Sequence, residues 1–389
     1  MRRHLSFVIC HLSFPAILAT SAFAASPAAP ASVPTSFLLG ADISALASPR
    51  FGPRAASAPA PTAQTYTDPA NPALSGELPI MMAHHWNAFR LRVFVSPVRS
   101  APNNSLENTI ALAKQIKAAG ATFLLDIHYS DTWADPQHQE TPVAWRNLDT
   151  TQLAQKVHDY TLDVLHQLAA AGAAPDMVQV GNEITGGMLW PTGHVKVPPS
   201  TVKTDAGRIQ PLPDPYDDAT QWANLLKFLH AGTSAVREAT RDHPVKIVIH
   251  IDCGGDWPTT QWFFDHLTAD KVDYDIIGQS FYPNYHGTLD ELANNIQQCT
   301  ARYHKSFLIA ETGYPQTGGD AITSRKYMSW PGTPEGQAKF MTDLLTTAKK
   351  AGAIGVFYWA PEGRGRGNAL WTAQGAPDPA MLVGDHLAP

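Results

Sequence analysis

The chain has 389 residues, of which 44% are hydrophobic and 16% charged, which is enough apolar material for one large core. Its formal net charge of −6 excludes the strongly basic surface on which nucleic-acid binding depends, and no apolar stretch beyond the N-terminal segment is long enough to cross a bilayer. We therefore expect one folded domain with a neutral or mildly acidic partner.

The first 24 residues have the features of a cleavable export signal. Two arginines at the start precede a mostly apolar stretch over residues 5–22, and Ala22-Phe23-Ala24 has the small-x-small shape of a cleavage site. Residues 25–36 are rich in Ala, Pro and Ser and are predicted to be a flexible lead-in. The sequence thus predicts a secreted or periplasmic protein, without a membrane anchor after cleavage, whose folded domain covers residues 37–389.

Past residue 36, short apolar runs alternate with helical patterns, which is typical of βαβ units in a parallel sheet. The predicted strands are Phe37–Ile43, Ala88–Val95, Thr122–His128, Met177–Gly181, Lys246–Ile251, Tyr274–Ser280, Ser306–Glu311 and Gly355–Trp359. Helices are predicted over Leu106–Ala119, Leu153–Ala171, Trp222–Thr240 and Gly336–Ala351. This order predicts an α/β fold, a single (β/α)8 TIM barrel with extended βα loops. An open doubly wound sheet is the alternative, but its usual glycine-rich phosphate loop is missing after the first run.

Polar and aromatic residues follow six of these apolar runs, at the strand ends that converge on the mouth of a barrel. Glu183 and Glu311 each directly follow a buried strand, and burying two carboxyls near each other costs stability without a functional reason. Glycoside hydrolysis needs such a pair, one acid to protonate the leaving oxygen and one carboxylate on the opposite face. A lone glutamate would more simply cap a helix, but the pair predicts Glu183 as acid/base and Glu311 as nucleophile.

Other polar residues at the same strand ends are candidates for holding the substrate or the glutamates. Arg90 and Arg92 alternate with apolar residues, so both can face the interior, where one could keep Glu311 ionised and one could form a structural ion pair. Asn182 could donate to a sugar hydroxyl or simply form a turn. His128 could orient a neighbour, bind a hydroxyl or be a satisfied core histidine.

Aromatic residues also gather in or beside the loops at this end of the predicted barrel. They are Trp133, Trp190, Tyr282, Trp359 and Trp371. Because flat sugar faces stack on such rings, their gathering favours a carbohydrate ligand, although packing in the core is the alternative for each one.

At these residues the sequence resembles glycoside hydrolase family 53, whose members are endo-β-1,4-galactanases. The resemblance runs from about Gly40 to Trp371 and is most specific in HYSDTWADP (residues 128–136) and GNEI (residues 181–184). It implies a retaining mechanism with Glu183 as acid/base and Glu311 as nucleophile, on the β-1,4-galactan backbone of type I arabinogalactan. The residues assigned to substrate binding are Asp42, Arg90, His128, Asp131, Trp133, Asn182, Tyr282 and Trp359. The enzyme is expected to act as a monomer.

The chain also departs from this family. Some bacterial members hold calcium in the last loop, but acidic ligands are not evident after Trp359, so we predict no metal and no cofactor. An insertion, 194–215, could wall the cleft and alter product length. Cys253 and Cys299 could pair or stay as buried thiols. Two alternatives remain: a retaining mannanase or glucanase on the same barrel, and a carbohydrate-binding barrel without turnover.

Overall fold

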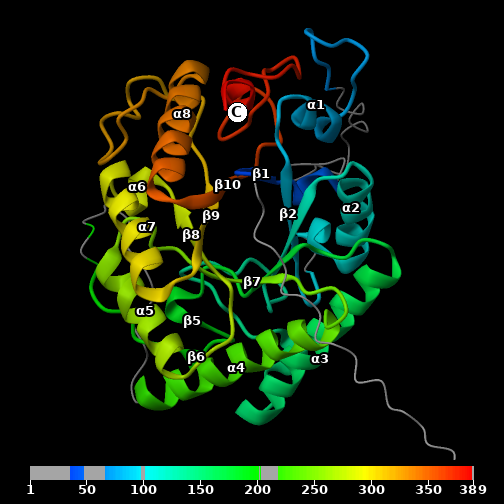
Figure 1. Cartoon of the computed structure of the whole chain (residues 1–389), viewed down its shortest axis with the longest axis vertical. Coiled ribbons are helices and arrows are strands. Elements are labelled where there is room, and N and C mark those ends of the chain that lie inside the picture. Colours follow the sequence, from blue (N-terminus) through cyan, green and yellow to red (C-terminus); the bar gives the residue numbers. More distant parts are fainter. Residues whose placement is uncertain (1–35, 48–65, 98–100, 201, 203–217, 388–389) are drawn as a thin grey trace, which may run out of the picture.

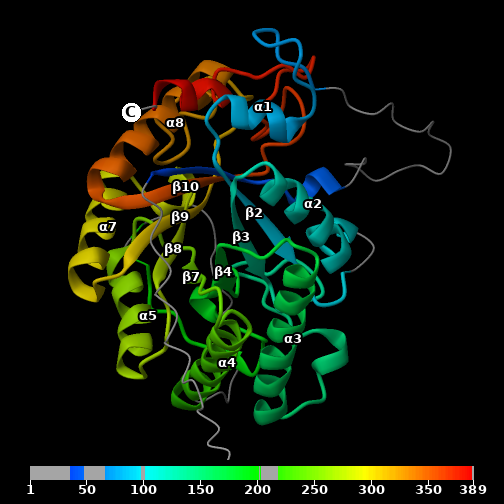
Figure 2. The ribbon, with the colours of Figure 1, turned by 45° about the vertical axis from the view of Figure 1, so that its right-hand side comes forward.

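The computed structural model describes residues 36–47, 66–97, 101–200, 202 and 218–387. The predicted signal, the lead-in up to residue 35 and most of the 194–215 insertion lie outside the described residues. Eight parallel strands close into a barrel in the order β1-β10-β9-β8-β7-β4-β3-β2, and the helices lie around it (Figure 1, Figure 2). This confirms the predicted (β/α)8 barrel.

The barrel strands agree with the predicted ones to within two residues at either end. They are β1 (Leu38–Asp42), β2 (Ala88–Val93), β3 (Thr122–Ile127), β4 (Met177–Val180), β7 (Lys246–Ile251), β8 (Ile276–Phe281), β9 (Ser306–Thr312) and β10 (Ala353–Trp359). A small antiparallel hairpin of β5 (Gly187–Met188) and β6 (Gly193–His194), which is not among the predicted elements, follows β4.

The α-helices of the described chain are α1 (Glu77–Ala83), α2 (Leu106–Ala118), α3 (Thr150–Ala170), α4 (Asp218–Ala239), α5 (Trp257–Ala269), α6 (Pro283–His286), α7 (Leu289–Tyr303) and α8 (Pro334–Ala351). Helix α3 begins three residues before its predicted start, because a capping box between Asp149 and Gln152 satisfies the backbone of a polar first turn. Gly120, Gly172 and Gly352 end α2, α3 and α8 with φ of 77°, 69° and 101°, left-handed conformations that glycine adopts without strain. No helix among the described residues is long and apolar enough to span a membrane.

The bottom of the barrel interior is filled by one apolar side chain from each strand. This apolar plug consists of Leu38, Ala88, Leu124, Met177, Val248, Ile276, Leu308 and Phe357. Gly40 leaves room for it, since a Cβ there would lie 2.5 Å from the Phe357 ring. On β2, β3, β4 and β7, the next inward position carries Arg90, Asp126, Gln179 and His250 instead. The interior is therefore apolar below and polar above, directly under the mouth.

Candidate active site

Glu183 and Glu311 lie at the ends of β4 and β9, in one cleft at the mouth of the barrel. Glu183 leaves β4 through a sharp turn, in which Gly181 has a φ of 83° and Glu183 itself is left-handed with φ 47° and ψ 47°. A non-glycine residue in that conformation is strained, and such residues cluster at functional sites. Both residues are nearly buried, with 7% and 8% of their surface exposed. The predicted pair is thus brought together.

Glu311 has partners that favour its ionised form. The Tyr282 hydroxyl donates to Oε1 at 2.6 Å, and Arg90 Nη1 donates to Oε2 at 3.1 Å. Burial raises the pKa of Glu311, and the Arg90 charge and the Tyr282 hydrogen bond oppose that rise. Arg90 thus contacts Glu311, as the strand pattern allows, but the pKa of Glu311 remains above its ordinary value, so an ionised Glu311 stays a prediction.

Glu183 has no cation in contact with its carboxyl among the described residues. Its Oε1 lies 2.5 Å from Ser280 Oγ, and Ser280 Oγ lies 2.9 Å from His250 Nε2. Burial raises the pKa of Glu183 well above its ordinary value, and repulsion from Glu311 and Asp252 adds to this rise. The two carboxyls therefore differ in the way that an acid and a nucleophile must differ.

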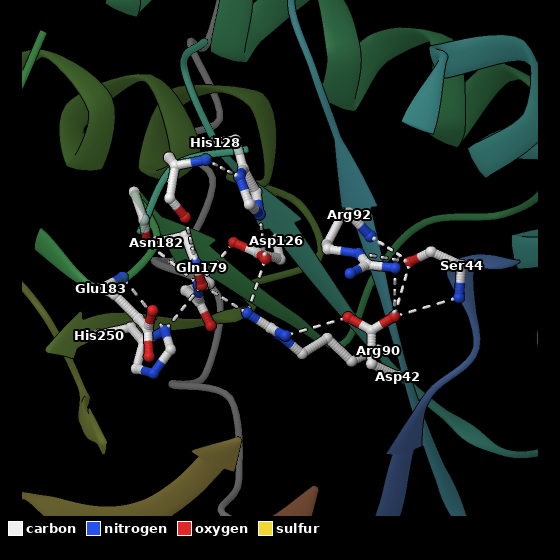
Figure 3. A network of polar contacts seen from close by, with 12 residues as sticks. Asp42, Ser44, Arg90, Arg92, Asp126, His128, Gln179, Asn182, Glu183 and His250 are labelled. Atoms are coloured by element: carbon white, nitrogen blue, oxygen red, sulfur yellow. Dashed lines mark hydrogen bonds and ion pairs between the residues drawn. The ribbon is translucent and has the colours of Figure 1, made fainter. Parts of the chain in front are cut away.

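Arg90 is the centre of the polar layer below the cleft (Figure 3). Its side chain is fully buried, with Nη1 3.0 Å from Asp42 and Nη2 2.7 Å from Asp126 and 2.6 Å from Asn182. Against the effect of burial, Arg90 lowers the pKa of Asp126. One guanidinium thus holds several acidic and amide oxygens, and through Glu311 it connects this layer to the cleft.

The cleft is formed by two adjoining hollows that share Glu183, Glu311, Asp135 and Trp359. The larger hollow, about 600 Å³, also contains Tyr282, Tyr285, His286, Arg325 and Met328 in its wall. The smaller, about 280 Å³, is also lined by Arg92, His128, Trp133 and Asn182. Because the hollows meet at the two glutamates and then continue along different residues, a chain-like ligand can extend on both sides of them.

The structure places the predicted substrate-binding residues in two groups. Asn182, His128, Trp133, Tyr282 and Trp359 line the cleft. By contrast, Asp42, Arg90 and Asp131 line neither hollow: the first two form the buried ion pair, and Asp131 accepts the Val143 backbone N–H at 2.8 Å. Substrate contact by these eight residues remains a prediction.

The aromatic residues at the mouth also divide into two groups. Trp133 is 40% exposed, its ring centre lies 6.4 Å from that of Trp359, and the Arg92 guanidinium lies 4.5 Å from its centre. Trp371, in contrast, is completely buried and packs 4.6 Å from Tyr66. A sugar-stacking role for Trp371 is therefore wrong, because its ring belongs to the core.

His128 is held from both sides by the protein. Its Nδ1 accepts the Ala134 backbone N–H at 3.0 Å, so its proton is on Nε2, which donates to Asp126 at 3.0 Å. This geometry favours the orienting role among the alternatives considered for His128.

Four polar residues of the site have no role among the sequence-based predictions: Asp126, His250, Asp252 and Ser280. His250 and Asp252 both face inward on or just after β7, the one strand end without a predicted site residue. Two polar residues with strand parity in KIVIHID would have been the signal.

Neither metal nor disulfide chemistry is visible in the described part of the chain. No group of three or more His, Cys, Asp or Glu residues there is arranged to hold a metal ion, and the absence of a metal remains a prediction. Cys253 and Cys299 are both buried and are not joined by a disulfide, which excludes the pairing considered for them.

A closed parallel barrel with two carboxylic acids in one cleft at its C-terminal mouth is the architecture of a barrel glycoside hydrolase. The profile of Glycosyl hydrolase family 53 matches residues 38–382, and the chain belongs to this family.

Individual relatives agree with this assignment. The chain is 41% identical over 286 residues to an uncharacterized protein of Niallia circulans, covering 71% of this chain and 73% of that protein. It is 34% identical over 291 residues to the arabinogalactan endo-β-1,4-galactanase of Thermothelomyces thermophilus, covering 72% and 80%. The GH53 catalytic domain of Ignisphaera aggregans superimposes with a TM-score of 0.75 at 28% identity, covering 93% of this chain and 99% of that one.

Proposed function

We propose that this chain is a retaining endo-β-1,4-galactanase that hydrolyses the β-1,4-galactan backbone of type I arabinogalactan. The observation that carries the proposal is the unequal carboxyl pair in one cleft: Glu183 contacts the neutral Ser280 hydroxyl, whereas Glu311 contacts Arg90 and Tyr282. Family membership supports the sugar, since relatives 33–34% identical to this chain are named arabinogalactan endo-β-1,4-galactanases.

The reaction follows from these surroundings in two steps. The Glu311 carboxylate attacks the anomeric carbon while Glu183 gives its proton to the departing glycosidic oxygen, which leaves a glycosyl-enzyme ester. Water then attacks the same carbon, Glu183 takes the proton of that water, and Glu311 is released. Arg90 and Tyr282 stabilise the carboxylate that leaves and re-forms, and the high pKa of Glu183 keeps it protonated for the first step.

The shape of the cleft supports internal cleavage of a polymer. The hollows extend from the glutamates in two directions, and the exposed rings of Trp133 and Tyr285 lie one in each hollow. Aromatic rings on both sides of the reacting pair suit sugar units on both sides of the cleaved bond.

The test is hydrolysis of purified potato galactan, with β-mannan and β-glucan in parallel and products resolved by length over time. We expect short β-1,4-galacto-oligosaccharides from galactan alone, first released as the β anomer in NMR spectra. The Glu311→Ala variant, purified in the same way, controls for contaminating activity. Release from mannan or glucan instead would support the corresponding barrel glycosidase, an α product would exclude the retaining mechanism, and no release from any polymer would favour a binding protein.

We also propose that the enzyme is exported and acts as a monomer. The support is the charged start, apolar stretch and Ala22-Phe23-Ala24 site of the N-terminal sequence. Expression in a bacterial host should give a periplasmic or secreted protein that begins at Ala25, as measured by N-terminal sequencing, and light scattering should give the mass of one chain. An intact N-terminus on cytosolic protein would contradict export.

A further inference from the structure

Ser280 and His250 connect Glu183 to the polar layer, and the proposed function assigns neither of them a role. Both are completely buried, on the neighbouring strands β8 and β7. Ser280 Oγ is within hydrogen-bond distance of two groups, Glu183 Oε1 at 2.5 Å and His250 Nε2 at 2.9 Å. A hydroxyl has only one hydrogen, so Ser280 can donate to one of these two groups at a time.

The position of the proton on His250 decides which group needs that hydrogen, and Asn182 fixes this position. Arg90 can only donate, so the atom of Asn182 that lies 2.6 Å from Arg90 Nη2 must be its oxygen. The amide nitrogen of Asn182 then donates to the Ala134 carbonyl at 2.8 Å. The atom of Asn182 that faces Arg90 is therefore the oxygen Oδ1, which can only accept hydrogen bonds.

His250 Nδ1 lies 2.9 Å from this acceptor oxygen, so the contact is favourable only if Nδ1 carries a proton. The Glu183 backbone N–H also points at Nδ1, at 3.4 Å, and would require the opposite form of the ring. The shorter contact is the stronger one and places the proton on Nδ1. Burial and the Arg90 charge lower the pKa of His250 to about 3, so the ring is neutral and Nε2 is an acceptor.

This arrangement is fully satisfied in only one protonation state of Glu183. With a proton on Glu183, the carboxylic acid donates to Ser280, Ser280 donates to His250 Nε2, and His250 donates to Asn182. With Glu183 ionised, Ser280 must turn to the carboxylate, which leaves Nε2 unpaired, or stay on Nε2, which leaves the carboxylate without its donor. An unpaired buried acceptor is costly.

We propose that neutral His250, with its proton held on Nδ1 by Asn182, keeps Glu183 protonated by competing with it for the single hydrogen of Ser280. His250 and Ser280 are thus positioning residues for the acid. This role deepens the proposed function and rests on it, because it acts through the acid step of that mechanism. After Glu183 has given its proton to the leaving oxygen, Ser280 turns to the new carboxylate, and the unpaired Nε2 favours recovery of a proton from the attacking water.

Other charges also act on this pair, and the experiment must leave them unchanged. The groups that face Glu183 or His250 are Arg90, Asp126, His128, Asp135, Asp252, Tyr282 and Glu311. Among the described residues, no side chain of this group forms a hydrogen bond with the Ser280 hydroxyl, although Glu311 is the strand neighbour of Ser280. Substitutions confined to His250 therefore change the competition for the Ser280 hydrogen and keep these neighbours.

Two variants of His250 separate the proposed arrangement from its opposite. In His250→Asn the amide nitrogen replaces Nδ1 as donor to Asn182, and the acceptor at Nε2 is lost. In His250→Gln the amide nitrogen reaches the Nε2 position and donates to Ser280. Both changes free the Ser280 hydrogen for Glu183, so the alkaline midpoint of kcat/KM for galactan should fall by about one pH unit in each, the effect of about one hydrogen bond.

The opposite arrangement, with the proton on Nε2, has Ser280 donating to Glu183 from the start. His250→Gln would then copy the native donor and leave the midpoint unchanged, and His250→Asn would lose that donor and raise it. Either result in correctly folded protein, judged by an unchanged circular dichroism spectrum, overturns the proposal. A loss of activity without a shift in the midpoint also overturns it, because a structural role alone would act in that way.

The ring of His250 can also be observed without any turnover. In protein labelled with ¹⁵N-histidine, the signals missing from His250→Asn identify the His250 ring, or site-specific labelling does so if the variant fails to fold. We expect the neutral form with its proton on Nδ1. A proton on Nε2, or on both nitrogens, overturns the proposal. Because this measurement needs no substrate, it decides the question even if galactan is not cleaved.

Discussion

The lower and upper parts of the barrel interior are built by the same strands and differ in what they bury. The apolar plug contains eight hydrophobic side chains, whereas two residues further along β2, β3 and β7 the inward positions hold Arg90, Asp126 and His250. Both layers are almost inaccessible to water. Alternation along a strand therefore sets only which side chains face inward. The residue type at each inward position decides whether a layer packs the core or contributes to the active site.

Burial affects the stability of the fold differently in the two parts. In the apolar plug, removal from water stabilises the fold, while in the polar layer it has to be offset by pairing. Arg90 supplies most of that pairing by contacting Asp42, Asp126 and Glu311. Glu183 forms no ion pair with Arg90 among the described residues and keeps a raised pKa. The uncompensated carboxyl is thus the one that the mechanism needs in its protonated form.

The largest expected effect is on turnover, when the two glutamates above the polar layer are replaced by neutral residues. Glu311→Gln should lower turnover of galactan by about 10⁴-fold or more, and Glu183→Gln by about 10² to 10⁴-fold, because one loses the nucleophile and the other the acid. Steady-state rates with purified variants measure both. A near-native rate in either variant would remove that residue from its role.

Neither glutamate variant should lose stability. The pKa of Glu183 is raised in the fold, so ionisation destabilises the native state as pH increases above the unfolded value. Below that pH both states are protonated and the effect vanishes. Glu183→Gln should therefore match the parent in acid and be more resistant to urea at neutral pH, an outcome opposite to that of any substitution in the apolar plug.

The sequence predicts the barrel well because its strands are buried on both sides and read as mainly apolar runs, such as FLLDI before His128. It also predicts Glu183 and Glu311, since each follows such a run. What it cannot predict is pairing between strands. The contact of Ser280 with His250 joins residues 30 positions apart, and the parity of His250 in KIVIHID indicates that it faces inward but not which group it meets. Likewise, the burial of Trp371 depends on Tyr66, which is distant in sequence.

A smaller effect is expected on stability rather than rate. The stability cost of a substitution should depend on pH in the polar layer but not in the apolar plug. Arg90→Met leaves Asp42, Asp126 and Glu311 without their shared cation, which should cost about 3–5 kcal/mol at neutral pH. Arg90 holds the pKa of Asp126 below its ordinary value against the effect of burial, so without Arg90 burial raises this pKa and the folded variant takes up a proton as the pH falls. The cost of the variant should therefore shrink toward pH 4, as measured by urea unfolding at both pH values.

Leu124→Ala is the matched control from the apolar plug. Leu124 lies two residues before Asp126 on the same strand and faces the same side. Leu124 is completely buried, and deleting its methyl groups should cost about 2–5 kcal/mol through lost apolar contact and the cavity that remains. Because no ionisable group changes its surroundings, this cost should be the same at both pH values. If the two variants respond to pH alike, the polar layer is not held by its charges, and Arg90 would be there for its packing rather than for its pairing with Glu311.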